Sequence, residues 1–211
     1  MAISFYTVAA ICGNFHWEST VNPGIYESLN VVPLTDNNVY GGYGLGQWTN
    51  APQYGLTRRT QLVNWLRNNG YADDSGDGQC AYILAENHWV QNVGNYATLN
   101  DFLNNTETNI SNLTLIWMRN WEGIYNSSIS QRRTFANSVY QELIEHYNDP
   151  MITDWYVGNR YLSTADQISN SVMVARALMG GSPTPPGPTP TPGPTAEEII
   201  LLKKKRRCER L

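Results

Sequence analysis

The chain has 211 residues, a formal net charge of −4 at pH 7 and only 15% charged residues. This length suits one domain better than two, and no apolar run reaches the roughly 18 residues needed to cross a bilayer. The acidic balance argues against a nucleic-acid-binding core, and the 11% of aromatic residues argues against a disordered acidic tail.

The first predicted element is a buried helix over residues 3–17. Apolar side chains recur in it at helical spacing, at Phe5, Val8, Ala9, Cys12 and Phe15. Pro23 and Gly24 follow its end. No Lys or Arg precedes the apolar stretch, so we interpret it as part of the fold and not as a secretory signal.

Glu18 lies where this helix ends. The negative end of the helix dipole and the neighbouring rings of Phe15 and Trp17 both disfavour a carboxylate, so we expect a raised pKa for Glu18. A carboxyl group that stays protonated near neutral pH is what glycosidic cleavage requires as a general acid. The alternative is a solvated glutamate at a frayed helix end.

Residues 30–46 predict a small hairpin and a glycine-rich turn. The glycines of Gly41–Gly46 lack the spacing of a phosphate-binding loop. They suit a backbone that lies close to a ligand, to which Tyr43 and Trp48 offer rings and Gln47 an amide. The chain is rich in such groups, with 23 Asn, 7 Trp and 13 Tyr, and amides and flat rings are the groups that contact sugars. The alternative is a tight turn that packs a tryptophan.

The rest of the body predicts further helices over residues 57–69, 77–90, 97–104, 110–121, 129–147 and 163–179. The fold class is therefore α+β, dominated by α, with a minor hairpin near the N-terminus. Arg132 and Arg133, at the start of one of these helices, are expected to be solvated.

Nothing in the sequence predicts a metal or a cofactor. The three histidines lack metal-ligand spacing. The acidic run Asp73–Gly78 lacks the glutamate that closes an EF-hand loop, so we interpret it as a turn that caps the next helix. Three cysteines make no disulfide framework, and Cys12 and Cys80 are expected to be buried, inert thiols.

The C-terminal part differs in composition from the body. All lysines lie at positions 203–205, and residues 180–195 hold seven of the eleven prolines. We predict a folded unit over 1–179, an extended linker over 180–195 and a basic tail over 196–211. Residues 1–195 carry a net charge of −7.

Two motifs give the chain a family resemblance. Glu18-Ser19-x-x-Asn22-Pro23-Gly24, followed by Gly44-Leu45-Gly46-Gln47-Trp48, resembles the phage tail lysozyme family, and in motif also lytic transglycosylases and goose-type lysozymes. The resemblance covers roughly residues 8–148. It implies a lysozyme-like fold, peptidoglycan as substrate and Glu18 as the catalytic acid. It also implies that Ser19 and Gln47 belong to the substrate site, and it places Glu122 where the family has a late acidic residue.

One departure from the family concerns its opening helix. Met1 begins too late to include it, yet Asn159-Arg160-Tyr161-Leu162-Ser163 and the following residues resemble that opening. Either the fold is circularly permuted, with residues 155–179 in the place of the missing helix, or these residues begin a second, truncated copy. We favour the permuted fold, because permutation is tolerated where termini lie close together.

The sequence as a whole predicts a lysozyme-type glycosidase of a phage tail that cleaves peptidoglycan. The alternatives are a lytic transglycosylase acting on the same bond and a non-catalytic wall-binding tail module. Expected partners are glycan strands and other tail proteins, with no nucleic acid and no membrane span. The expected location is the virion tail or the host cell wall, since a body of negative charge suits delivery by a particle better than free diffusion to an anionic wall.

A hydrolase also needs a second carboxylate on the opposite face of the sugar. Asp36, in the predicted hairpin, and Glu122, beside Trp121, are about equal candidates. Glu27 is ranked below them as a solvated acid. A transglycosylase would need none of the three.

Overall fold

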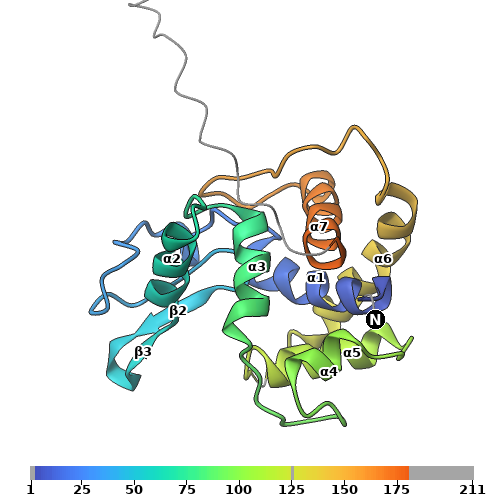
Figure 1. The fold of residues 1–211 in the computed structure, drawn as a ribbon, viewed down its shortest axis with the longest axis horizontal. Helices are drawn as coiled ribbons and strands as arrows, with labels where there is room; N and C mark the ends of the chain where they lie inside the picture. The colour runs from blue at the N-terminus through green and yellow to red at the C-terminus, as the bar shows by residue number, and fades with distance from the viewer. Residues whose placement is uncertain (1–2, 125, 181–211) are drawn as a thin grey trace, which may run out of the picture.

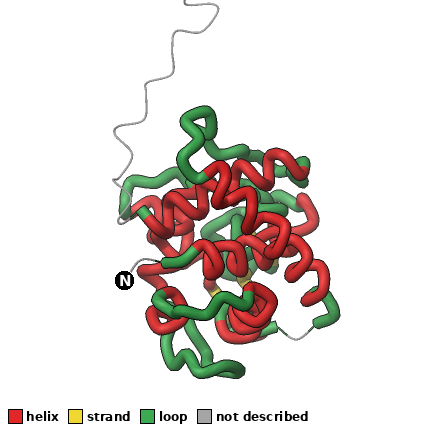
Figure 2. Tube along the Cα trace, turned by 90° about the vertical axis from the view of Figure 1, so that its right-hand side faces the viewer, coloured by secondary structure: helices red, strands yellow, loops and turns green. Residues whose placement is uncertain are grey.

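A computed structural model of the chain describes residues 3–124 and 126–180. The described part contains seven α-helices and one three-stranded antiparallel sheet (Figure 1). Helices and loops make up nearly all of the trace, and the strands occupy only a small part of it (Figure 2). The predicted α+β class, dominated by helix, is confirmed.

All seven helices that periodicity predicts are present. They are α1 (Phe5–Ser19), α2 (Arg58–Asn68), α3 (Gly76–Glu86), α4 (Leu99–Leu103), α5 (Ile110–Asn120), α6 (Ile129–His146) and α7 (Thr164–Met179). Short 3-10 turns lie at Glu27–Leu29 and Pro52–Tyr54. The predicted helix over 77–90 ends early, because Asn87 adopts a left-handed conformation with φ of 47° and caps α3. Ser75, in the acidic turn, caps the other end of α3 by accepting from the Gly78 amide.

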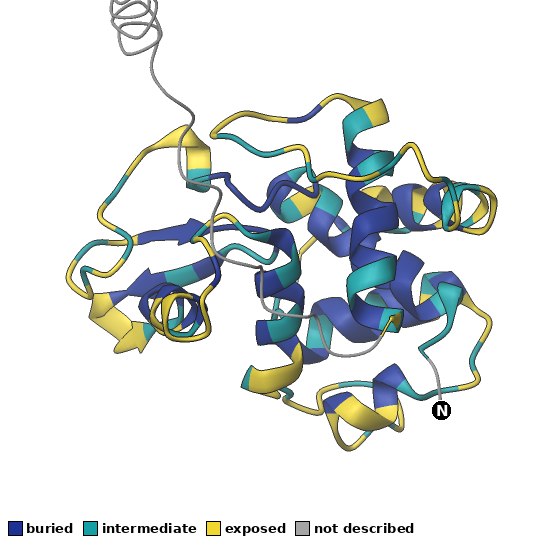
Figure 3. Cartoon of the chain, turned by 45° about the horizontal axis from the view of Figure 1, so that its top comes forward, coloured by how far each residue is buried: buried dark blue, intermediate teal, exposed yellow. Residues whose placement is uncertain are grey.

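The central helix of the fold is α1, which is buried along most of its length (Figure 3). It packs against α5, α6 and α7. A Cβ at Gly13 would lie 2.5 Å from the Arg132 carbonyl oxygen and 2.6 Å from Ala136 Cβ. The glycine therefore permits the close crossing of α1 and α6 that brings Arg132 beside the end of α1.

The sheet consists of β1 (Gly41–Tyr43), β2 (Trp48–Ala51) and β3 (Leu56–Thr57) in that order. Tyr43 pairs with Trp48, so the glycine-rich segment between them is the turn of the β1–β2 hairpin. The predicted position of the hairpin, residues 30–46, is therefore wrong. The hairpin begins at Gly41, and residues 30–40 form no strand.

The physical reason lies in Arg59 on α2, which is fully buried. Its guanidinium donates hydrogen bonds to the carbonyl oxygens of Pro33, Leu34, Asp36, Val39 and Gly41. These carbonyl groups therefore turn toward a side chain and not toward a neighbouring strand. Burial lowers the pKa of Arg59 from its ordinary value, and the five carbonyl groups compensate for the lost hydration.

The C-terminal helix α7 is part of the core. Val172, Val174, Ala175 and Leu178 are buried, and α7 packs against α1, α3 and α6. The predicted linker over 180–195, except for Gly180, and the predicted tail over 196–211 lie outside the described residues.

Cys12 and Cys80 are buried as expected, and burial raises the pKa of Cys12 to about 12. Cys208 lies outside the described residues.

No helix within residues 3–124 and 126–180 has the length and hydropathy that a membrane span requires.

Candidate active site

A cleft of about 400 Å³ opens beside the C-terminal end of α1. Its walls come from the end of α1, the loop that follows it, the hairpin turn, the start of α2, the segment after α5, and Tyr161. The lining residues with acidic or amide side chains are Glu18, Glu27, Glu122 and Gln47. A cleft of this size and mixed polarity is typical of ligand sites.

Glu18 lies on the last turn of α1 and lines this cleft. Its side chain is 21% exposed, so it is accessible from the cleft but largely enclosed. Of the two rings expected to desolvate it, Phe15 is buried and Trp17 is half exposed. Glu18 forms an ion pair with Nη2 of Arg132.

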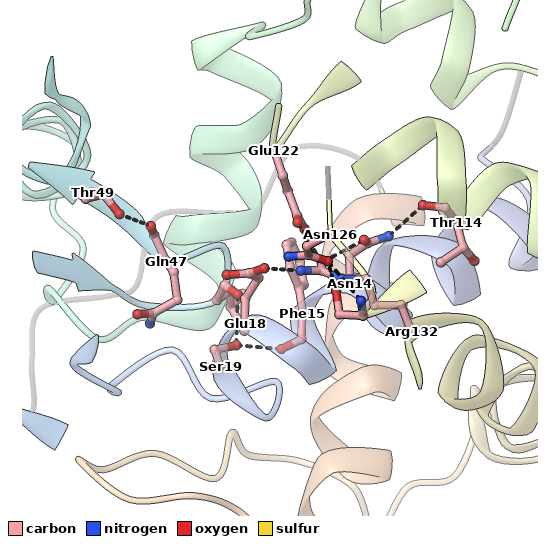
Figure 4. A network of polar contacts seen from close by, with 12 residues as sticks. Asn14, Phe15, Glu18, Ser19, Gln47, Thr49, Thr114, Glu122, Asn126 and Arg132 are labelled. Atoms are coloured by element: carbon pink, nitrogen blue, oxygen red, sulfur yellow. Dashed lines mark hydrogen bonds and ion pairs between the residues drawn. The ribbon is translucent and has the colours of Figure 1, made fainter. Parts of the chain in front are cut away.

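Arg132 binds a second carboxylate as well, as Figure 4 shows. Its Nη1 donates to Glu122 Oε2 at 2.6 Å and to Asn14 Oδ1 at 2.9 Å, and its Nε donates to Ser128 Oγ at 2.8 Å. The Arg132 side chain is fully buried, and that of Glu122 is 5% exposed. Glu18 and Glu122, 104 positions apart in sequence, are thus held on one guanidinium.

The prediction that Arg132 is solvated is wrong. Arg132 lies on the same face of α6 as the buried residues Phe135, Ala136, Val139 and Leu143. The spacing of these positions places Arg132 one turn before them on the buried face. This periodicity could have identified Arg132 from the sequence, although its partners could not be named from it.

The charges at this cluster do not balance if both carboxyl groups are ionised. Two carboxylates face one guanidinium, and the second proton is hard to remove from such a pair. Burial raises the pKa of Glu122 well above its ordinary value. The nearby Glu18 raises it further, while Arg132 acts in the opposite direction.

The hairpin turn is fixed to the end of α1 through Ser19. The Ser19 hydroxyl lies 2.9 Å from the Phe15 carbonyl oxygen and 2.8 Å from the Leu45 carbonyl oxygen. A Cβ at Gly46 would lie 2.4 Å from Trp121, so only glycine lets the turn pack on this ring. Ser19 is buried and connects two walls of the cleft from behind.

Among the other residues expected to bind substrate, Gln47 lines the cleft, with its Nε2 donating to the Gly44 carbonyl oxygen at 3.0 Å. Tyr43 and Trp48 are buried behind it. Trp48 Nε1 donates to Glu86 Oε2 at 3.2 Å, and that carboxylate also binds Arg58. Tyr43, Trp48 and Ser19 therefore support the cleft wall and do not expose a surface to the cleft.

The candidate second carboxylates occupy different places. Asp36 does not line the cleft; its Oδ1 accepts from the Asn38 amide at 2.8 Å within a turn. Glu27 does line the cleft, and its Oε2 accepts from the Gly42 amide at 2.8 Å. The sequence-based ranking of Asp36 above Glu27 did not foresee this, because Arg59 draws the backbone around Asp36 toward α2.

No group of three or more His, Cys, Asp or Glu side chains suited to a metal occurs among residues 3–124 and 126–180. His16, for example, stacks on Phe135 with ring centroids 4.1 Å apart and contacts Gln167 through Nδ1 at 2.5 Å. Burial lowers its pKa from the ordinary value.

The family described as phage tail lysozyme matches residues 2–143. Morphogenesis protein 1 of Bacillus phage B103 is 32% identical over 145 residues, which are 65% of this chain and 35% of that protein. The chain therefore spans about a third of the length of this relative. Because the family match covers more than half of the sequence, and the motifs around Glu18 and Gln47 lie within it, the chain belongs to the phage tail lysozyme family.

Proposed function

We propose that the chain is a glycosidase of lysozyme type that cleaves the glycan strands of peptidoglycan, with Glu18 as the general acid. One observation carries this proposal. Glu18, at the cleft, and the buried Glu122 share a single buried guanidinium. The family membership supports peptidoglycan as the substrate class.

The shared guanidinium explains how a proton would be kept for catalysis. If the carboxyl pair retains one proton, the cluster with Arg132 is neutral, and burial favours this state over a net negative charge. Glu122 is the more deeply buried partner and its pKa is raised. Glu18 is the partner that substrate can reach.

In the proposed reaction, the proton held by Glu122 passes to Glu18 through the hydrogen bond between the two carboxyl groups. Glu18 then protonates the glycosidic oxygen as the bond from that oxygen to the anomeric carbon breaks. The departing strand takes the proton as a hydroxyl group, and positive charge develops on the ring oxygen and anomeric carbon. Glu18 and Glu122 are then both ionised against Arg132. The negative charge that they gain opposes the positive charge that develops on the sugar.

For the second carboxylate we propose Glu27 in place of Asp36, because Glu27 lines the same cleft as Glu18. The Gly42 amide donates to Glu27 Oε2, and the Tyr40 hydroxyl donates to Oε1 at 3.5 Å, so both oxygens of the Glu27 carboxylate are positioned by neighbours. In this position Glu27 would activate water or stabilise the sugar cation. Glu122 instead acts as the proton-sharing partner of Glu18.

The negative charge of the body and the match to a phage morphogenesis protein favour a virion-borne enzyme. In this proposal the chain acts on the host wall from the tail, next to other tail proteins. A particle that brings the enzyme to the wall removes the need for electrostatic attraction over long range.

The first prediction concerns Glu18→Gln. The amide keeps the shape of the side chain but cannot donate the proton, so turnover of purified peptidoglycan should fall by about 10²–10⁴-fold. Glu145→Gln, which removes an exposed acid of α6, is the matched control and should leave turnover unchanged. A Glu18→Gln protein that digests wall within threefold of the parent would show that Glu18 is not the acid.

Mass spectrometry of the digest tests the reaction type. Hydrolysis is expected to give reducing ends. Anhydro ends would instead show that the chain is a lytic transglycosylase. No products from the unmodified chain would favour a non-catalytic wall-binding module.

The second prediction compares Glu27→Gln with Asp36→Asn. Loss of a positioned base or nucleophile should lower turnover by about 100-fold for Glu27→Gln. Asp36→Asn should stay within a few fold of the parent, because Asp36 lies outside the cleft. Equal activity of both variants, together with anhydro ends in the products, would show that no second carboxylate is used.

A further inference from the structure

Two aromatic rings border the cleft and are left uncovered. Trp17 is 48% exposed and Tyr161 is 62% exposed. They contrast with Trp48, Trp117 and Trp121, which are fully buried. Large apolar surfaces that stay exposed beside a cleft are a frequent mark of a binding site.

Tyr161 belongs to residues 155–163, here called the C-terminal strap, which connect α6 to α7 through the preceding loop. The strap lies beyond the residues that match the family, 2–143. It nevertheless contributes a ring to the cleft that holds Glu18.

The strap is attached directly to the segment that follows α1. The buried Asn22 donates from its Nδ2 to the carbonyl oxygens of Gly158 at 2.6 Å and Arg160 at 2.7 Å. The Leu162 amide donates to Thr20 Oγ1 at 3.0 Å. Tyr161 is therefore held between two anchored neighbours.

A second set of contacts joins the strap to the wall that carries Glu27. The Asn159 side chain accepts from the Tyr26 amide at 3.1 Å and donates to the Leu29 carbonyl oxygen at 2.9 Å. Together with the bonds to Thr20 and Asn22, these bonds fix the strap to residues 20–29 of the loop between α1 and the sheet. A ring placed on such a fixed backbone loses little conformational freedom when a ligand binds.

We propose that Trp17 and Tyr161 form a sugar-stacking subsite for an N-acetylhexosamine ring of the glycan strand. A pyranose ring has an apolar face of C–H groups that packs on an aromatic face, and a tyrosine hydroxyl can in addition form hydrogen bonds with water or with the sugar. The inference rests on the proposed glycan substrate. It adds that a segment beyond the matched family region completes the binding site.

Binding of chitohexaose, measured by calorimetry, tests this inference in the Glu18→Gln background, where the sugar is not consumed. Tyr161→Ala and Trp17→Ala should each weaken binding by about tenfold, as expected for loss of one stacked ring. Tyr161→Phe should bind within twofold of the unsubstituted background. Tyr161→Leu keeps apolar bulk without a flat ring and should behave like Tyr161→Ala.

Tyr156→Ala is the matched control, because Tyr156 is a 44% exposed tyrosine of the same strap that does not line the cleft. It should leave chitohexaose binding unchanged. In the active protein, Tyr161→Ala should raise KM about tenfold with little effect on kcat, which a general loss of folding would not produce.

The outcomes separate the subsite from the catalytic proposal. Equal binding by the Tyr161→Ala and Tyr156→Ala proteins would overturn the subsite even if the parent cleaves peptidoglycan. Absence of chitohexaose binding in the Glu18→Gln protein would overturn it as well. If the chain binds chitohexaose through the Tyr161 and Trp17 rings but cleaves no peptidoglycan, the subsite would be supported and the proposed hydrolase activity would be contradicted.

Discussion

At the scale of single residues, the site depends on Arg132. It binds two glutamates from distant parts of the chain, Glu18 and Glu122, so that the charge of one carboxyl group affects the ionisation of the other. Removing one member of a buried ion pair is strongly destabilising, because the remaining charge stays buried without a partner. Arg132 therefore has a structural and an electrostatic role at once.

The third prediction concerns the pH dependence contributed by Glu122. Its pKa is raised in the folded protein, so the folded state holds a proton that the unfolded state has lost. Stability must therefore fall as pH rises from the ordinary glutamate pKa of 4.5 toward the raised value, by up to about 1.4 kcal/mol per pH unit. Glu122→Gln, which is neutral at every pH, should lack this loss.

The measurement is the melting temperature of the parent and of Glu122→Gln between pH 4.5 and pH 8. The difference should shift in favour of Glu122→Gln as pH rises. Glu145→Gln, which removes an exposed carboxyl group, should track the parent across the range. A constant difference between parent and Glu122→Gln would contradict a raised pKa at Glu122.

At the scale of elements, the loop before the sheet is organised by a side chain and not by strand pairing. Arg59 holds the backbone of residues 33–41 from its buried position on α2. This places the first strand at Gly41, whose neighbour Gly42 fixes Glu27. Through this loop, the position of α2 helps to set the position of Glu27 in the cleft.

The fourth prediction compares Arg59→Lys with Arg67→Lys. Lysine cannot satisfy five carbonyl groups, and hydrogen bonds to charged groups contribute about 1.5–3 kcal/mol each, so Arg59→Lys should lose at least about 3 kcal/mol of unfolding free energy. Arg67 pairs with Asp73 at an exposed site, so Arg67→Lys should lose less than about 1 kcal/mol. Urea denaturation and hydrogen exchange of residues 33–41 measure both effects. Equal losses would show that Arg59 does not organise the loop.

At the scale of the whole molecule, the C-terminal part of the chain packs against its N-terminal part, with α7 beside α1 (Figure 1). The strap contacts the segment after α1, and α7 contacts α1 itself. We propose that residues 1–179 form one folded unit, with 155–179 in the place of the family's opening helix. The contacts of α7 favour this permuted arrangement over a truncated second copy.

The fifth prediction concerns truncation. A chain ending at Gly181 should melt and act like the full chain, because the removed residues follow α7. A chain ending at Asp149 would lose α7 with its buried Val172, Val174 and Leu178, each worth about 1.5–3 kcal/mol of burial, and should unfold or melt far lower. The melting temperatures of the two truncated chains are measured by circular dichroism. Equal melting temperatures would contradict the permuted fold.

The sequence by itself determined the helical elements and the position of Glu18 at the end of α1. Apolar spacing is a local property, so the helices could be placed within a few residues. The motifs containing Glu18 and Gln47 also identified the family, and both residues line the cleft. These inferences need only residues that are close together in the chain.

Only the tertiary structure decided which distant groups meet. The pairing of Arg132 with Glu18, the exclusion of Asp36 from the cleft and the presence of Tyr161 on its border all depend on how helices cross and loops close. The sequence spacing of Arg132 could show that it is buried but not what it binds. Partners more than a hundred residues apart are selected by packing and by the need to satisfy buried charge, and neither is encoded in a local pattern.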